Sequence, residues 1–338
     1  MTTSPRVLRI WSSDGIIYNL NDIVIEMCSS MAKQQDIVLD NEFEGPCLRS
    51  IGYKQDINLL SIIEKCCERF NYDKKKITYA TSNLIEDRSL LPNITYNFHN
   101  NKGNLFFAWQ KKIKNFDKDL KYHFGSFIQH STYPRLFFGS LLHDQYRDKS
   151  LYSYRRDLAD PIHACNMDLE QFFFNFLDKK YFPQLNKLIS DLPIQVLASD
   201  CNDHLADDLI GSYSKFFVDI VTETYFTGDL FFLSEKTARP LATKTPFLLF
   251  GAKHTLKHLR QIGFQTFDKF WSESYDGAEG ALRCQMMSAV IENISKMPVD
   301  RLKDLYNRML PVLEHNYKLY NSIDADVVKK CFGIGDRQ

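Results

Sequence analysis

The sequence predicts an α/β protein of two domains followed by C-terminal helices, and three observations lead to this fold class. Segments typical of strands and helices alternate through residues 7–98. The order strand, loop, helix, strand recurs in residues 213–251. The chain has 338 residues, 44% of them hydrophobic, which is enough for two domains with separate cores.

The first domain is expected to span residues 1–118. Apolar residues in 59–70 recur at helical spacing and predict an amphipathic helix that packs on a sheet. The lysine-rich segment 111–121 is the expected linker, and the alternative is a basic patch for a phosphate-bearing acceptor. The other expected elements are strands at 7–11, 36–39, 77–81 and 94–98 and a helix at 21–31.

The second domain is expected to span residues 119–280, and helices are expected to fill residues 281–338. Gly263 should end a helix at 253–262, because glycine readily adopts the left-handed conformation of a helix C-terminus. Four phenylalanines in 172–176 predict a buried helix that begins at Asp168. The other expected elements are strands at 122–128, 150–154, 216–222 and 245–250, and helices at 135–145, from 235, at 280–296 and at 299–320.

Charged residues stand where a strand ends and where a helix begins in the second domain. Glu223 follows the strand 216–222, and Ser234 can cap a helix whose first two positions are Glu235 and Lys236. Ligands of open α/β sheets bind beyond the carboxyl ends of strands, beside helix N-termini. These residues are therefore a candidate binding site, and Arg239, one turn further, can pair with Glu235 or with a phosphate.

A second candidate site is the start of the helix 135–145. Ser131 or Thr132 can cap this helix, and Pro134 suits its first turn. Free backbone N–H groups and the guanidinium of Arg135 would converge there on a phosphate. The alternative for Arg135 is a surface side chain whose stem covers apolar neighbours.

Charge and composition exclude several classes of protein. The 42 basic and 42 acidic residues balance, which argues against a general nucleic-acid binder but leaves a local groove open. The eight cysteines lack zinc-site spacing, so we expect no metal. Neither a P-loop nor a GxGxxG motif occurs, which argues against a P-loop kinase or a Rossmann dehydrogenase. No signal peptide and no apolar run near eighteen residues are recognisable, so we expect a soluble, cytoplasmic protein without a transmembrane segment.

The stretch from Tyr213 to Gly251 resembles the donor-binding segment of the α-1,3-fucosyltransferase family. The resemblance covers about forty residues, and the Glu235–Lys236 pair is its firmest part. Thr-Glu-Thr-Tyr stands where the family has Phe-Glu-Asn-Ser, and Ser-Glu-Lys stands where it has Thr-Glu-Lys. The matching positions are Tyr213, Lys215, Phe216, Thr222, Glu223, Thr224, Leu230 to Lys236, Pro246 and Phe247 to Gly251.

The resemblance implies two Rossmann-like domains of the GT-B type, facing a cleft. It implies a hexosyl- or pentosyltransferase that moves a sugar from a nucleotide-diphosphate sugar, GDP-fucose-like or other, to a glycan or other hydroxyl acceptor. Glu235 would bind the ribose hydroxyls, and Glu223 the hydroxyls of the donor sugar. Lys236 and Arg135 would stabilise the leaving diphosphate in place of a metal ion. No cofactor is expected beyond this co-substrate.

The acceptor hydroxyl needs a general base, which we expect from the first domain. Asp14 follows the first strand, and Glu42 and Glu44 follow the second. Glu44 is favoured because it is fixed between Phe43 and the breakers Gly45 and Pro46. Two other functions stay open: a non-catalytic interaction protein that keeps this fold, and a phage-type glycosyltransferase that acts on modified DNA bases.

Overall fold

The computed structural model has two compact units. Unit 1 comprises residues 1–104, 224–232 and 324–338, and unit 2 comprises residues 105–223 and 233–323. The boundary after residue 104 differs from the expected one after residue 118, because the turn Phe107–Trp109 contacts the helix at 235–242 and Lys118 donates to the Tyr213 carbonyl, both in unit 2. The structure describes residues 4–10, 12–13, 16–17, 19–41, 48, 58–96, 106–113, 117–128, 132–154, 179–194, 207–224, 226 and 228–335.

Unit 1 contains a four-stranded parallel sheet in the order β1-β4-β5-β6. The helices α1 and α2 follow β1 and β4 along the chain, as the alternation in the sequence predicted. The strands are β1 (Arg6–Arg9), β4 (Ile37–Asn41), β5 (Ile77–Thr81) and β6 (Asn93–Tyr96), the helices are α1 (Leu20–Ala32) and α2 (Leu59–Phe70), and β2 (Ser12–Ser13) pairs with β3 (Ile16–Ile17).

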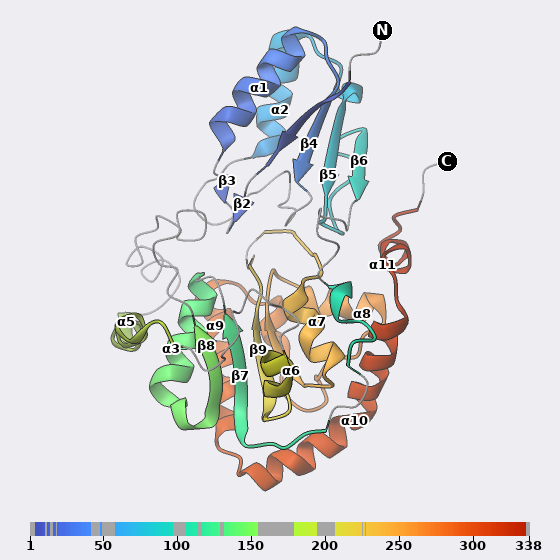
Figure 1. Ribbon diagram of the computed structural model, residues 1–338. Helices are drawn as coiled ribbons and strands as arrows, with labels where there is room; N and C mark the ends of the chain where they lie inside the picture. The colour runs from blue at the N-terminus through green and yellow to red at the C-terminus, as the bar shows by residue number, and fades with distance from the viewer. Residues whose placement is uncertain are drawn as a thin grey trace. The chain divides into compact units, whose positions relative to one another are not determined.

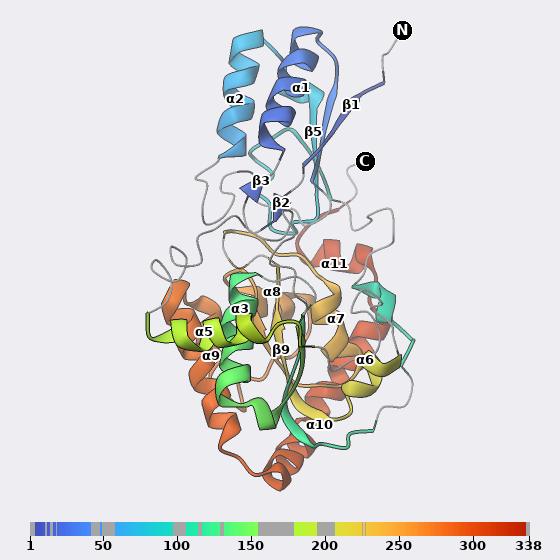
Figure 2. The ribbon, with the colours of Figure 1, turned by 60° about the vertical axis from the view of Figure 1, so that its left-hand side comes forward.

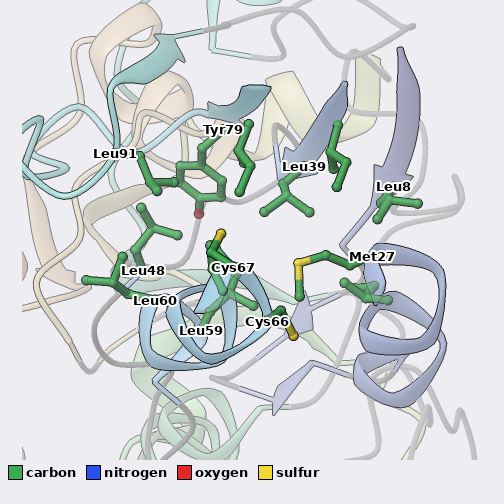
Figure 3. Packing of buried hydrophobic residues seen from close by; sticks show 14 of the residues in the cluster. Leu8, Met27, Leu39, Leu48, Leu59, Leu60, Cys66, Cys67, Tyr79 and Leu91 are labelled. Atoms are coloured by element: carbon green, nitrogen blue, oxygen red, sulfur yellow. The ribbon is translucent and has the colours of Figure 1, made fainter. Parts of the chain in front are cut away.

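The core of unit 1 lies between this sheet and its two helices. Figure 3 shows Leu39 and Tyr79, from the strands, facing Met27 of α1 and Cys67 of α2. The apolar face predicted for α2 is therefore the buried face. Asn58 caps this helix by accepting a hydrogen bond from the Ser61 N–H at 2.9 Å, as its residue type favours.

Unit 2 contains a second four-stranded parallel sheet, in the order β10-β9-β7-β8 (Figure 1). Every residue of β8, β9 and β10 is buried, which is typical of parallel strands covered on both faces. The strands are β7 (Tyr122–Ile128), β8 (Ser150–Tyr154), β9 (Phe216–Thr222) and β10 (Phe247–Phe250), with α3 (Tyr133–Gln145) between β7 and β8 and α7 (Glu235–Ala242) between β9 and β10.

Further helices pack on unit 2 or follow it along the chain (Figure 2). α5 (Phe182–Asp191) contacts α3, and α10 (Val299–Ser322) contacts α7, β7 and β9. Gly263 ends α8 with a φ of 111°, as predicted. The other helices are α6 (Asp207–Ser212), α8 (Thr255–Ile262), α9 (Gly280–Ser295) and α11 (Ala325–Cys331), with short 3₁₀ turns at Lys74–Lys76, Phe107–Trp109, Arg147–Lys149, Lys179–Tyr181 and Ser274–Gly277.

The predicted α/β class with two sheets is thus confirmed, with most element ends within about two residues of prediction. The predicted aromatic helix from Asp168 lies outside the described residues. Among the helices that the structure describes, none combines the length and apolar character needed to cross a bilayer.

Candidate functional site

The ends of three parallel strands form one edge of the unit 2 sheet, called here the carboxyl edge and defined by Ile128, Thr222 and Phe250. Glu223 directly follows β9, and its N–H donates to the Phe250 carbonyl at 2.8 Å. Gly251 follows β10, and a Cβ at this position would lie 3.4 Å from Glu223 Cγ. The edge is the place where open α/β sheets bind ligands.

Glu223 ties the carboxyl edge to the first turn of α7. Its carboxylate accepts hydrogen bonds at 2.7 Å from the hydroxyls of Ser234 and Thr237. Glu223 is only 3% exposed, so both hydroxyl donors lie within a buried cluster. The structure therefore gives Glu223 a positioning role that the sequence did not indicate, and its contact with a donor sugar stays a prediction.

The start of α7 matches the sequence prediction closely. Ser234 is the N-cap, and its hydroxyl accepts a hydrogen bond from the Lys236 N–H at 3.1 Å. The Lys236 ammonium lies 2.6 Å from the Glu235 carboxylate, with side-chain exposures of 23% and 11%. The two predicted donor-binding residues are therefore adjacent and ion-paired with each other.

Arg239 lies one turn further along α7 and is buried. Its positive charge acts on Asp219, which stands in the middle of β9 and accepts a hydrogen bond from the Tyr213 hydroxyl at 2.8 Å. Burial raises the pKa of Asp219 to about 7, against the effect of Tyr213, Arg239 and Lys118. The guanidinium charge of Arg239 thus acts on Asp219 within unit 2. Its contact with a phosphate stays a prediction.

The sequence alone gives only a weak indication of the buried cluster around Asp219. Lys118 is fully enclosed, and its ammonium donates to the Tyr213 carbonyl and to the Thr245 hydroxyl at 2.7 Å. Burial lowers the pKa of Lys118 well below its usual value. One signal was present, because Asp219 is a single acid within the apolar strand FFVDIVT.

The start of α3 lies at the same carboxyl edge. Arg135 is 3% exposed, and its Nε donates to the Thr222 carbonyl at 3.3 Å. Thr132 is the N-cap of α3, but its side chain makes no capping hydrogen bond. The buried hydroxyls of Thr132 and Thr222 find no hydrogen-bond partner among the residues described here.

Unpartnered hydroxyls are informative because buried polar groups are normally hydrogen-bonded. The Ser234 hydroxyl at the start of α7 donates to Glu223 and accepts from the Lys236 N–H. The Thr132 hydroxyl, at the equivalent place on α3, makes no hydrogen bond with the described residues. An anionic ligand at the start of α3 would supply the missing acceptor and would lie beside a cationic side chain. Among the residues that the structure describes, the start of α3 therefore has a buried hydroxyl with unused hydrogen-bonding capacity, whereas the Ser234 hydroxyl at the start of α7 has protein partners.

Several predicted site residues lie outside the described residues: Asp14, Glu42, Glu44 and Ser131. Within the described part of the chain, no group of three or more His, Cys, Asp or Glu side chains could hold a metal ion. A scan of protein-family models finds no match to this sequence, and a search of curated proteins finds none either.

Proposed function

We propose that this chain is a glycosyltransferase of the GT-B type, in which unit 2 binds a nucleotide-diphosphate sugar. The acceptor is a glycan or another hydroxyl-bearing molecule. A single observation carries the proposal most directly. The buried hydroxyls of Thr132 and Thr222, which have no hydrogen-bond partner among the described residues, stand beside the buried Arg135 at the carboxyl edge of a parallel sheet.

The chemistry of sugar transfer matches these groups. As the bond from the sugar C1 to the diphosphate breaks, negative charge grows on the departing diphosphate oxygens. Arg135, the start of α3 and the Lys236 ammonium would stabilise this charge. The acceptor oxygen forms the new bond to C1 and passes its proton to a base, for which Glu44 is the proposed residue.

Glu223 supports this reaction in the proposal without touching the reacting atoms. It fixes Ser234 and Thr237, and with them the first turn of α7, where Glu235 would accept hydrogen bonds from the ribose hydroxyls. The Glu235–Lys236 ion pair would open as the nucleotide binds, because its two partners would then contact the ribose and the diphosphate.

The decisive experiment compares two threonine-to-valine variants in a thermal-shift titration with GDP, UDP and their sugar conjugates. Thr132→Val removes a hydroxyl that has no hydrogen-bond partner in the described part of the chain, so it should leave the free energy of unfolding nearly unchanged. The same variant should weaken nucleotide binding about tenfold, or about 1.4 kcal/mol, because a hydrogen bond to a charged phosphate is lost.

Thr237→Val is the matched control. It removes a hydroxyl that donates to Glu223, so we expect a loss of about 2 kcal/mol in unfolding free energy. If no nucleotide raises the melting temperature of the wild type, the proposed function is wrong. Binding without turnover on any acceptor would favour the non-catalytic alternative.

A further inference from the structure

A nine-residue segment interrupts the candidate site along the chain. Residues 224–232, called here the strap, follow Glu223 and precede Leu233 and the N-cap Ser234. The strap belongs to unit 1, whereas the residues on both sides of it belong to unit 2. The strap therefore joins Glu223 to Ser234 along the chain.

Asn83 holds the strap with both ends of its side-chain amide. Its Oδ1 accepts a hydrogen bond from the Phe231 N–H at 2.9 Å, and its Nδ2 donates to the Asp229 carbonyl at 3.2 Å. The next residue, Leu84, adds a backbone N–H that donates to the Phe231 carbonyl at 2.8 Å. One backbone hydrogen bond and two bonds of the Asn83 side chain thus join the strap to the chain after β5.

Contacts within unit 1 other than those with the strap also hold Asn83. Its side chain is fully buried, and Nδ2 also donates to Glu86 Oε2 at 3.2 Å. Its own N–H donates to the Thr81 hydroxyl at 3.1 Å. Both polar atoms of the Asn83 side chain are hydrogen-bonded, so its amide group has one orientation. That orientation fixes which strap residues can bond to it.

We infer that Asn83 is a positioning residue of the donor site, acting through the strap. The Ser234 hydroxyl donates to Glu223 across the two ends of the strap, and Asn83 holds the strap at Asp229 and Phe231, shortly before Ser234. Releasing Asp229 and Phe231 would remove a constraint on the nearby Ser234, and through it on the amide and ammonium of Lys236. This inference rests on the proposed function only for its effect on nucleotide binding.

The test replaces Asn83 by alanine in the full chain and measures amide hydrogen exchange together with nucleotide binding. Asn83→Ala should speed exchange about tenfold at Phe231 and also at the Lys236 amide. Affinity for GDP or UDP, whichever protects the wild type, should fall about tenfold. Asn93→Ala is the matched control, because Asn93 donates to the Lys75 carbonyl in the same unit and does not contact the strap.

Unchanged protection at Lys236 in Asn83→Ala would overturn the inference, because a purely local role in unit 1 would loosen Phe231 alone. Faster exchange at Lys236 with unchanged nucleotide affinity would overturn it as well. Protection at residues 77–81 reports whether unit 1 remains folded. If the wild type binds no nucleotide, the proposed function fails, and exchange at Lys236 still decides whether Asn83 orders the start of α7.

Discussion

His123 shows how burial makes one side chain sensitive to pH. Its Nε2 lies 2.8 Å from the Met297 carbonyl, which can only accept, so Nε2 carries the proton. Its Nδ1 is buried and has no hydrogen-bond partner in the part of the chain that is described. Burial therefore lowers the pKa of His123 from its ordinary value of 6.5.

This lowered pKa fixes the sign of a stability change. The unfolded chain binds the proton more readily, so the contribution of His123 is complete above pH 6.5 and is lost as pH falls through the lower folded pKa. We expect His123→Gln, whose amide can still donate to the Met297 carbonyl, to lose less stability than the wild type between pH 7.5 and about pH 5.5.

Urea unfolding at several pH values measures the difference between the two proteins. The comparison must be between variant and wild type, because Asp219 has the opposite dependence. Burial raises the pKa of Asp219 to about 7, so its contribution is complete below its usual value of 3.8 and is lost as pH rises towards 7. Equal pH slopes for the variant and the wild type would contradict the assignment to His123.

At the scale of elements, the contact between β7 and β9 depends on a glycine. A Cβ added to Gly125 would lie 2.3 Å from Cζ of the Phe216 ring, far inside the contact distance. That ring also meets the rings of Tyr213 and Phe127, with centroids 5.0 Å and 5.9 Å away. The aromatic side chains at this end of the sheet therefore pack on bare backbone.

Gly125→Ala should destabilise unit 2 by about 1–3 kcal/mol, because overpacking forces the Phe216 ring or the strands apart. Gly211→Ala is the matched control, since nothing lies within 4 Å of a Cβ there and the residue is in α6. Alanine is favoured over glycine in a helix by about 0.5–1 kcal/mol, so this control should gain stability. Chemical denaturation measures the free energy of unfolding of both variants. An unchanged free energy of unfolding in Gly125→Ala would contradict the close contact between Gly125 and the Phe216 ring.

At the scale of the whole molecule, residues 324–338 belong to unit 1 together with residues 1–104. The Arg88 guanidinium donates to the carbonyls of Phe332 and Gly333 at 2.8 Å and 2.6 Å. The Phe332 ring lies 5.5 Å from that of Phe231 in the strap. Residues 324–338 are thus part of unit 1, although more than two hundred residues separate them from Arg88.

Deletion of residues 324–338 should therefore loosen unit 1 selectively. Loss of the Arg88 contacts and of the Phe332 ring should cost about 2 kcal/mol, or more than tenfold in amide exchange at residues 77–81 and 93–96. Exchange at residues 122–128, in unit 2, should stay as in the wild type. Phe332→Ala in the full chain should act in the same direction with a smaller effect, and equal loosening of both units would contradict the prediction.

The local parts of this molecule could be predicted from sequence because their signals lie within a few residues. Strand β9 in FFVDIVT, the Ser234 cap and the glycine end of α8 each follow from nearest-neighbour chemistry. The candidate site was predicted at the level of its edge, since strand ends and helix starts locate it. The partners of its side chains were not predicted, and Arg239 with its charge beside Asp219 is the clearest example.

The sequence by itself determined the α/β class, the strand and helix positions and the placement of Glu223, Ser234 and Arg135 at a strand end or a helix start. Only the tertiary structure decided that Glu223 holds Ser234 and Thr237, and that Asn83 meets Phe231, 148 residues away. It also decided that the hydroxyls of Thr132 and Thr222 have no hydrogen-bond partner among the residues that are described. The physical reason is that secondary structure and caps depend on neighbouring residues, whereas hydrogen-bond partners across a core depend on how the whole chain packs.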